Sequence, residues 1–255
     1  SLQSFRYRTK STMIEETQPL TGAHVNPHVK DATAEVRRGF IRKVYGILTA
    51  QLLLTALVAV PFQFVGQWWL LSNQWLLYLS VGMTIVTICA MTCCHEAARR
   101  YPTNYLLLFV FTAFEGVMVG FLSAQYTWQS VLLAAGVAAA IFLALTAFAW
   151  TSETDFTGMG VYLFAALMTL CLFGLVVAIL SACGVYLKWM VMLYDIIGIL
   201  IFVCYIVFDT QLILGEYGGH KLQFGIDDYA FAALNLYMDI IQLFMLLLRL
   251  LGNRR

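Results

Sequence analysis

Charged side chains are scarce in this chain of 255 residues. Asp, Glu, Lys and Arg together make up 11% of the residues, whereas an ordinary water-soluble domain contains roughly 25%. Hydrophobic residues make up 61%, and the mean hydropathy is +0.80. This composition excludes a water-soluble fold, and the length suits about seven membrane helices joined by short loops.

Several patterns that define ligand sites are also absent. The formal net charge is only +1, so no basic surface is predicted and nucleic acid is excluded as a partner. The six cysteines form no CxxC pair, which excludes a zinc or redox site of that type, and we expect them to be packed thiols. The four histidines lie outside the apolar runs, and the last apolar run contains no lysine. A haem and a retinal Schiff base are therefore not expected.

The first 40 residues contain no long apolar run. Without such a run they do not form a cleavable signal peptide. We expect residues 1–40 to be a disordered cytosolic tail and residues 41–255 to be a single transmembrane domain.

Seven long apolar runs follow this tail. They cover residues 44–65, 75–94, 105–124, 131–150, 160–182, 189–214 and 229–251. Each is long enough to cross a hydrocarbon layer of about 30 Å. The breaks between them are short, so neighbouring helices should be antiparallel. The sequence therefore predicts an all-α membrane protein with seven transmembrane helices.

The distribution of basic residues predicts the orientation of these helices. Basic residues precede the first run and follow the second, whereas the loops on the other side, residues 66–74 and 125–130, carry no charge. These basic residues are Arg37, Arg38, Arg42, Lys43, Arg99 and Arg100. By the positive-inside rule the N-terminus is cytosolic. Seven crossings then place Arg254 and Arg255 on the other side, which the same rule mildly disfavours. A last segment that re-enters would keep them in the cytosol, but seven crossings are favoured.

Four acidic residues fall inside the apolar runs: Glu115, Asp195, Asp209 and Asp239. A charge inside a membrane helix costs several kcal/mol, so such residues are candidates for function. Lys188 and Arg249 lie near the ends of their runs, so no basic residue is expected at a comparable depth. An uncompensated carboxylate either keeps its proton or binds a cation. Either outcome couples the protein to protons or metal ions.

The last apolar run carries a polar stripe. Asp228, Asn235, Asp239, Gln242 and Arg249 follow one another at spacings of seven, four, three and seven residues. These spacings place them along one face of a helix. We expect this face to support the acidic site by lining the bundle interior or a water-filled path.

Asp209 and Asp239 are predicted to form a pair. Asp209 lies near the cytosolic end of its helix, and Asp239 lies about ten residues, or roughly 15 Å, in from the same side. Two carboxylates in contact would share one proton. Loss of that proton would leave two negative charges, which either repel each other and open the site or attract a hard cation such as calcium.

A structural role remains open for each buried acid, because such side chains also hold helices together. Glu115 lies on a face with Thr112, Gly116, Gly120 and Ser123. This face is explained equally well by a pathway acid or by close helix packing. Asp195 is likewise either a pathway acid or a structural residue.

The C-terminal motifs resemble the signature of the transmembrane Bax inhibitor motif family. The matching segments are DTQLILG at residues 209–215, DDY at residues 227–229 and LYMDIIQLF at residues 236–244. Residues 36–45, VRRGFIRKVY, are similar to the lifeguard branch of that family. The resemblance covers roughly residues 35–252.

This resemblance implies six helices around a central C-terminal seventh. It also implies a pH-sensitive calcium leak from internal stores that affects cell-death signalling, with Asp209 and Asp239 as the di-aspartyl sensor. Calcium would be the permeant or transiently bound ion, with no other cofactor. The implied partners are the lipid membrane, calcium, protons and cell-death regulators or receptors. The implied locations are the Golgi, the endoplasmic reticulum, the lysosome or the plasma membrane.

Three other functions compete with a channel. Tyr194-Asp195 matches one half of the pattern of intramembrane aspartyl proteases, but neither Asp209 nor Asp239 follows the Gly-x-Gly of the other half, so an enzyme is not predicted. An interaction protein could regulate receptors or channels through its tail and loops without conducting ions. A proton/calcium exchanger could use the shared proton as a transport substrate.

Overall fold

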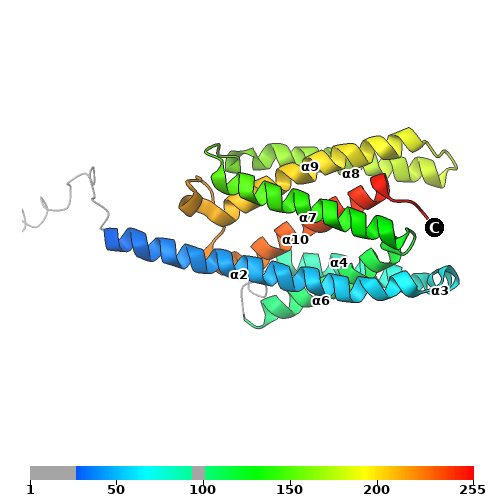
Figure 1. The fold of residues 1–255 in the computed structure, drawn as a ribbon, viewed down its shortest axis with the longest axis horizontal. Coiled ribbons are helices and arrows are strands. Elements are labelled where there is room, and N and C mark those ends of the chain that lie inside the picture. Colours follow the sequence, from blue (N-terminus) through cyan, green and yellow to red (C-terminus); the bar gives the residue numbers. More distant parts are fainter. Residues whose placement is uncertain (1–26, 94–100) are drawn as a thin grey trace, which may run out of the picture. The chain divides into compact units, whose positions relative to one another are not determined.

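The computed structural model describes residues 27–93 and 101–255, and this part of the chain is helical and contains no strand (Figure 1). The chain divides into two units, residues 1–36 and residues 37–255. Of the first unit, only the helical residues 27–36 are described. The second unit contains everything that follows.

Seven of the described helices are long and apolar enough to cross a membrane. They are α2 (Pro27–Ala59), α4 (Gln74–Cys93), α6 (Thr103–Ser123), α7 (Trp128–Thr151), α8 (Gly160–Ala182), α9 (Lys188–Leu214) and α10 (Tyr229–Leu251). Shorter helical elements lie between them: η1 (Val60–Phe64), α3 (Gln67–Ser72), η2 (Thr157–Met159), η3 (Gly215–Gly218) and η4 (Ile226–Asp228). The prediction of an all-α protein with seven transmembrane helices is confirmed.

Helix α2 begins earlier than the first predicted span. It starts at Pro27, and its residues Arg37, Phe40, Ile41 and Val44 are buried. Spacings of three, one and three residues place them on one helical face, so an amphipathic segment continues the span. Residues 27–40 are therefore helical, which differs from the predicted tail. Disorder stays a prediction for residues 1–26, which lie outside the described residues.

Helix α10 is the most buried of the seven described spans. In its most apolar stretch 67% of the residues are buried, compared with 11–50% in the others. It packs against α6, α7 and α9, and the hydroxyls of Tyr237 and Thr55 share a hydrogen bond of 2.6 Å that links it to α2. Helices α8 and α9 lie side by side (Figure 1). A position of α10 at the centre of six helices stays a prediction.

The segment after α10 lies against the turn between α6 and α7. The amide of Thr127 donates to the carbonyl of Asn253 (3.0 Å), and the amide of Arg255 donates to the carbonyl of Gln125 (2.9 Å). This segment is thus at the opposite end of α10 from Tyr229, as expected for a full crossing. The cytosolic orientation of the N-terminus stays a prediction, and Arg99 and Arg100 lie outside the described residues.

The cysteines differ from the prediction of packed thiols. Five of them are exposed on the helix surfaces: Cys89, Cys93, Cys171, Cys183 and Cys204. Cys94 lies outside the described residues. The prediction was wrong because a surface that faces lipid is as apolar as the interior, so an apolar sequence context does not separate the two.

Helices α2 and α6 approach closely at two glycines of α6. A Cβ atom added to Gly116 would lie 3.0 Å from Cβ of Val58, and one added to Gly120 would lie 2.5 Å from a ring carbon of Phe62 and 3.2 Å from Cα of Ala59. Small residues at a membrane helix interface permit this approach. The small-residue face beside Glu115 is thus a packing surface.

We expect Gly120→Ala to destabilise the protein by about 1–3 kcal/mol, because the new methyl group overlaps the ring of Phe62. Gly136→Ala in α7 is the matched control, since nothing lies within 4 Å of its added Cβ. Thermal unfolding of both purified variants in detergent measures the difference. Equal melting temperatures would show that Gly120 is not in close contact with Phe62.

Candidate functional site

Asp209 of α9 and Asp239 of α10 lie together inside the bundle. They are 4% and 6% exposed, and their carboxyl groups are close enough to interact directly. Oδ2 of Asp239 is buried and has no hydrogen-bond partner among the described residues. The structure thus brings together the two acids that the sequence pairs, and it leaves one oxygen of the pair unsatisfied.

Close packing between α9 and α10 positions this pair. A Cβ atom added to Gly198 of α9 would lie 2.9 Å from a methyl carbon of Leu246 in α10. Ile206, Leu236 and Leu243 are fully buried. The acids therefore project from two tightly packed antiparallel helices into apolar surroundings, where an unpaired charge is costly.

The end of α9 beyond Asp209 is held by Arg37 of α2. Its guanidinium donates to the carbonyls of Leu212 (2.7 Å), Leu214 (3.3 Å) and Phe224 (2.7 Å). A cation stabilises the carbonyl-rich C-terminus of a helix. Gly215 follows with a φ of +55°, and a Cβ there would lie 2.8 Å from Nη2 of Arg37, so the clamp requires a glycine at this position.

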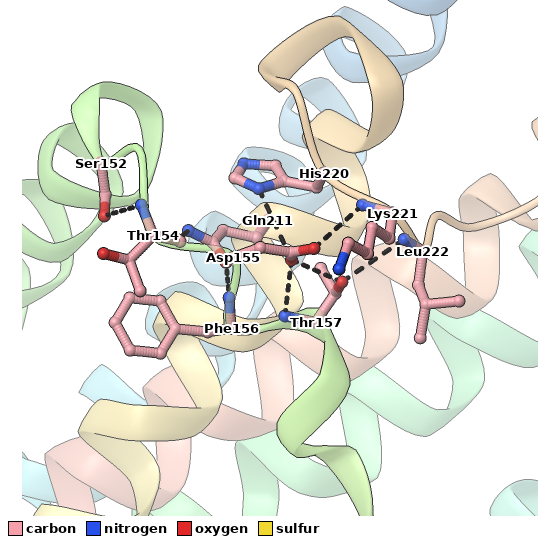
Figure 2. Close-up of polar contacts among 9 residues, drawn as sticks. All are labelled: Ser152, Thr154, Asp155, Phe156, Thr157, Gln211, His220, Lys221 and Leu222. Atoms are coloured by element: carbon pink, nitrogen blue, oxygen red, sulfur yellow. Dashed lines mark hydrogen bonds and ion pairs between the residues drawn. The ribbon is translucent and has the colours of Figure 1, made fainter.

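Gln211 holds the same end of α9 to the loop between α7 and α8. Its Nε2 donates to the carbonyl of Thr154 (2.9 Å), and its Oε1 accepts from the amide of Phe156 (2.8 Å), as Figure 2 shows. Gln211 is fully buried and lies two residues beyond Asp209. The position of Asp209 is thus tied to this loop.

Asp155 links that loop to the loop between α9 and α10 (Figure 2). Its Oδ1 accepts from the amide (3.0 Å) and the hydroxyl (2.6 Å) of Thr157, and its Oδ2 accepts from the amide of Lys221 (3.2 Å). Nδ1 of the buried His220 lies 3.8 Å from Oδ1, an ion pair when the imidazole is protonated. The hydrogen bonds from Thr157 lower the pKa of Asp155 below its ordinary value, although partial burial opposes them.

The rest of the polar stripe is less buried than Asp239. Asn235 and Gln242 are half-buried. Asp228 is the N-cap residue of α10 and is also half-buried, but its side chain makes no capping hydrogen bond. The supporting role predicted for these three residues stays a prediction.

Comparison with known proteins identifies the family. The family model described as "Inhibitor of apoptosis-promoting Bax1" matches residues 37–255. The chain belongs to this Bax inhibitor family. The matched segment begins at Arg37, the residue that clamps the end of α9 in this structure.

Several relatives share most of the chain. Protein lifeguard 3 of Homo sapiens is 35% identical over 223 residues, which cover 86% of this chain and 70% of the relative. Protein lifeguard 3 of Mus musculus is 33% identical over 224 residues, with 86% and 71% covered. Bax inhibitor 1 of Schizosaccharomyces pombe is 33% identical over 230 residues, with 88% and 80% covered. This Bax inhibitor family member is therefore similar to lifeguard 3 proteins, as its sequence motifs indicate.

Asp195 is not the uncompensated acid that the sequence predicts. The guanidinium of Arg249 donates through Nε to Oδ1 of Asp195 (2.6 Å), and its Nη2 contacts the same oxygen. Asp195 lies near the start of α9 and Arg249 near the end of α10, so antiparallel packing brings them to one level. The prediction was wrong because the long arginine side chain reaches inward from the end of its helix.

This ion pair also bears on the partial match of Tyr194-Asp195 to the intramembrane aspartyl protease pattern. The ring of Tyr194 lies 5.0 Å from the guanidinium carbon of Arg249, so both residues of the Tyr194-Asp195 match contact one arginine. In the structure Asp195 therefore pairs with a basic residue rather than with a second acid.

Glu115 of α6 is buried, but it lies on another side of α10 from the acidic pair. Tyr237 faces Thr55 of α2 and lies near Glu115. Asp239 follows Tyr237 by two positions, or about 200° around the helix. The structure thus does not bring Glu115 to the Asp209–Asp239 pair, and its pathway role stays a prediction.

Sequence reasoning missed the clamp residues around the pair. Arg37 contributes to the predicted orientation and to the lifeguard-like segment 36–45, but its clamp on α9 is not predicted, although its spacing from Phe40, Ile41 and Val44 indicates a buried helical face. Gln211 lies within the DTQLILG motif, but two positions correspond to about 200° around the helix, so a buried Asp209 did not indicate a buried Gln211. Nothing in the sequence indicated that Asp155 would meet His220, because the two loops are 65 residues apart.

We expect the Asp155 network to weaken at low pH. Because the pKa of Asp155 is lowered in the folded protein, its ionised carboxylate stabilises the loops at and above the ordinary aspartate pKa, and this contribution is lost as the pH falls through the lowered value. Asp155→Asn should weaken the contacts between the two loops already at neutral pH. Hydrogen exchange of the peptides that contain Thr157 and Lys221 measures it, with Glu153→Gln in the same exposed loop as control. Exchange that is unchanged in Asp155→Asn would contradict the proposed role of the network.

Arg249→Gln should destabilise the protein by about 1–3 kcal/mol, because it leaves Asp195 buried without its ionic partner. The double variant Asp195→Asn/Arg249→Gln should recover part of the loss, since the uncompensated charge is then removed. A double-mutant cycle on detergent-solubilised protein gives the coupling energy. Additive effects of the two changes would show that the pair contributes no net coupling.

Proposed function

We propose that this Bax inhibitor family member is a pH-sensitive calcium leak channel gated by Asp209 and Asp239. The contact between their two buried carboxyl groups carries this proposal. No Lys or Arg among the described residues forms an ion pair with either acid. The state of the pair is therefore set by protons and cations rather than by a fixed internal counter-charge.

The proposed gate works through the proton that the two carboxyl groups share. Two carboxyl groups form a hydrogen bond to each other only when one of them carries a proton. Loss of this proton leaves two negative charges in a low-dielectric interior, where they repel each other strongly. Either α9 and α10 separate at this level, or an oxygen-seeking cation such as calcium enters between the carboxylates. The free Oδ2 of Asp239 supports the second outcome, because it is available as a ligand.

The clamps around α9 support a gate at this level. Arg37 and Gln211 hold the last turn of α9 to α2 and to the loop between α7 and α8. The helix end therefore resists unravelling when the acids repel each other. We place the movement between α9 and α10, with Glu115 as a candidate pathway acid and Asp195 in a structural role.

In the cell, we propose that the protein modulates cell-death and calcium signalling from an endomembrane, with its N-terminus in the cytosol. The name of its family and its similarity to lifeguard 3 proteins support an anti-apoptotic role. Cell-death regulators or receptors are the proposed protein partners. The proposed activity is passive conduction and involves no catalytic step.

Calcium flux into proteoliposomes across a pH series tests the gate. Wild-type flux should rise with pH as the shared proton is lost. Asp209→Asn and Asp239→Asn should each flatten this pH profile, because an amide does not ionise. Asp227→Asn is the matched control: it makes the same change at an exposed residue before α10 and should keep the wild-type profile.

Other outcomes would assign other functions. Absence of flux in well-folded wild-type protein would rule out a channel and favour an interaction protein. Calcium uptake that is matched by proton release in fixed proportion, measured with a pH dye, would indicate a proton/calcium exchanger. An unchanged pH profile in both aspartate variants would show that Asp209 and Asp239 do not gate the flux.

A further inference from the structure

A pocket lies at the opposite end of the bundle from the acidic pair. Its volume is about 430 Å³, and it is bounded by α3, the start of α4, the end of α6 and the segment after α10. Leu70, Phe121 and Ala124 are buried at its apolar floor. Gln67, Gln74 and Gln125 add polar walls. The pocket thus combines an apolar floor with a polar rim.

Arg254 and Arg255 form the cationic side of this rim. The guanidinium carbon of Arg254 lies 5.8 Å from the ring centre of Tyr126, and Nη1 of Arg255 donates to the carbonyl of Gln63 (3.0 Å). The backbone beside them is fixed by hydrogen bonds to the turn between α6 and α7. The structure therefore holds both arginines at the pocket.

Acidic side chains do not neutralise the positive charge at this rim in the part of the chain that the structure describes. Neither arginine forms an ion pair with an acidic side chain among the described residues. Residues 66–73, which include α3, and residues 124–127, which form the turn between α6 and α7, contain no Asp or Glu. An anion entering the pocket would meet two cations without competition from a neighbouring acidic side chain.

Exposed aromatic residues show where the pocket lies relative to the membrane. Trp68, Trp69 and Trp75 are 82%, 43% and 59% exposed on α3 and α4. Exposed tryptophans of membrane helices gather at the level of the lipid headgroups. Leu71 and Tyr78 line the pocket and are also exposed, so an apolar surface continues from the pocket along α4. The pocket therefore meets both the headgroup layer and the acyl-chain layer.

We propose that this pocket binds an anionic phospholipid, with its phosphate at Arg254 and Arg255 and an acyl chain along Leu71 and Tyr78. Arginine recognises phosphate through paired hydrogen bonds, and the apolar floor excludes water from that contact. A volume of about 430 Å³ is in the range of small-ligand sites. A free phosphate would use the arginines but not the apolar surface, so the combined chemistry favours the lipid.

Native mass spectrometry of the full chain tests this site. The protein is purified from mixed micelles of phosphatidylglycerol and phosphatidylcholine with identical acyl chains. Wild type should retain phosphatidylglycerol preferentially, and Arg254→Gln/Arg255→Gln should bind it about fivefold more weakly for each arginine removed. Gln74→Glu places a negative charge in the pocket with almost no change in shape, so it should weaken binding without removing the contact of Arg255 with Gln63.

Matched controls separate this site from general surface charge. Lys188→Gln removes a cation from the start of α9, outside the pocket, and Gln129→Glu repeats the glutamine change at an exposed position of α7. Both should retain phosphatidylglycerol as wild type does. Equal losses in variants and controls, or equal retention of the two lipids by wild type, would overturn the proposal. Displacement of the lipid by millimolar inorganic phosphate alone would overturn the lipid as occupant and assign the arginines to a soluble anion.

Discussion

The high cost of a carboxylate inside a membrane organises this molecule. Each acid within a span must find a proton, a cation or a polar neighbour, and the acids do so in different ways. Asp209 and Asp239 contact each other, and Asp195 takes the guanidinium of Arg249. The helices that carry these acids are thereby fixed in register, because a shift by one turn would separate every one of these partners.

Helices α9 and α10 carry both of these contacts. They are joined near one end by the ion pair of Asp195 and Arg249 and nearer the other end by the contact of Asp209 with Asp239. The first contact pairs opposite charges, and arginine keeps its charge at any physiological pH. The second pairs two groups of like type, which share a proton in the proposed gate. The same two helices therefore carry one permanent contact and one contact that can change, which is the asymmetry that a gate requires.

The sequence predicted the spans well because the membrane imposes length and hydropathy directly. It also placed Asp209 beside Asp239, because antiparallel packing brings the end of one span beside the first half of the next. It failed to predict the partner of Asp195, because the long side chain of Arg249 extends inward from the end of its helix. It also failed to predict the exposure of the five described cysteines, because they face outward on surfaces as apolar as the core. The contact of Asp155 with His220 joins two loops, and no helical periodicity describes loops.

Contacts at both ends of α10 restrict how the helix can respond to repulsion between Asp239 and Asp209. Before its start, Arg37 holds the carbonyl of Phe224, and near its end Arg249 is paired with Asp195 while residues 253–255 bond to the turn between α6 and α7. A helix held at both ends does not slide along its axis without breaking one of these sets of contacts. Repulsion from Asp209 is then relieved by lateral separation from α9 or by a bound cation. Both responses open or occupy the space between the two helices, so the proposed calcium path runs beside this pair.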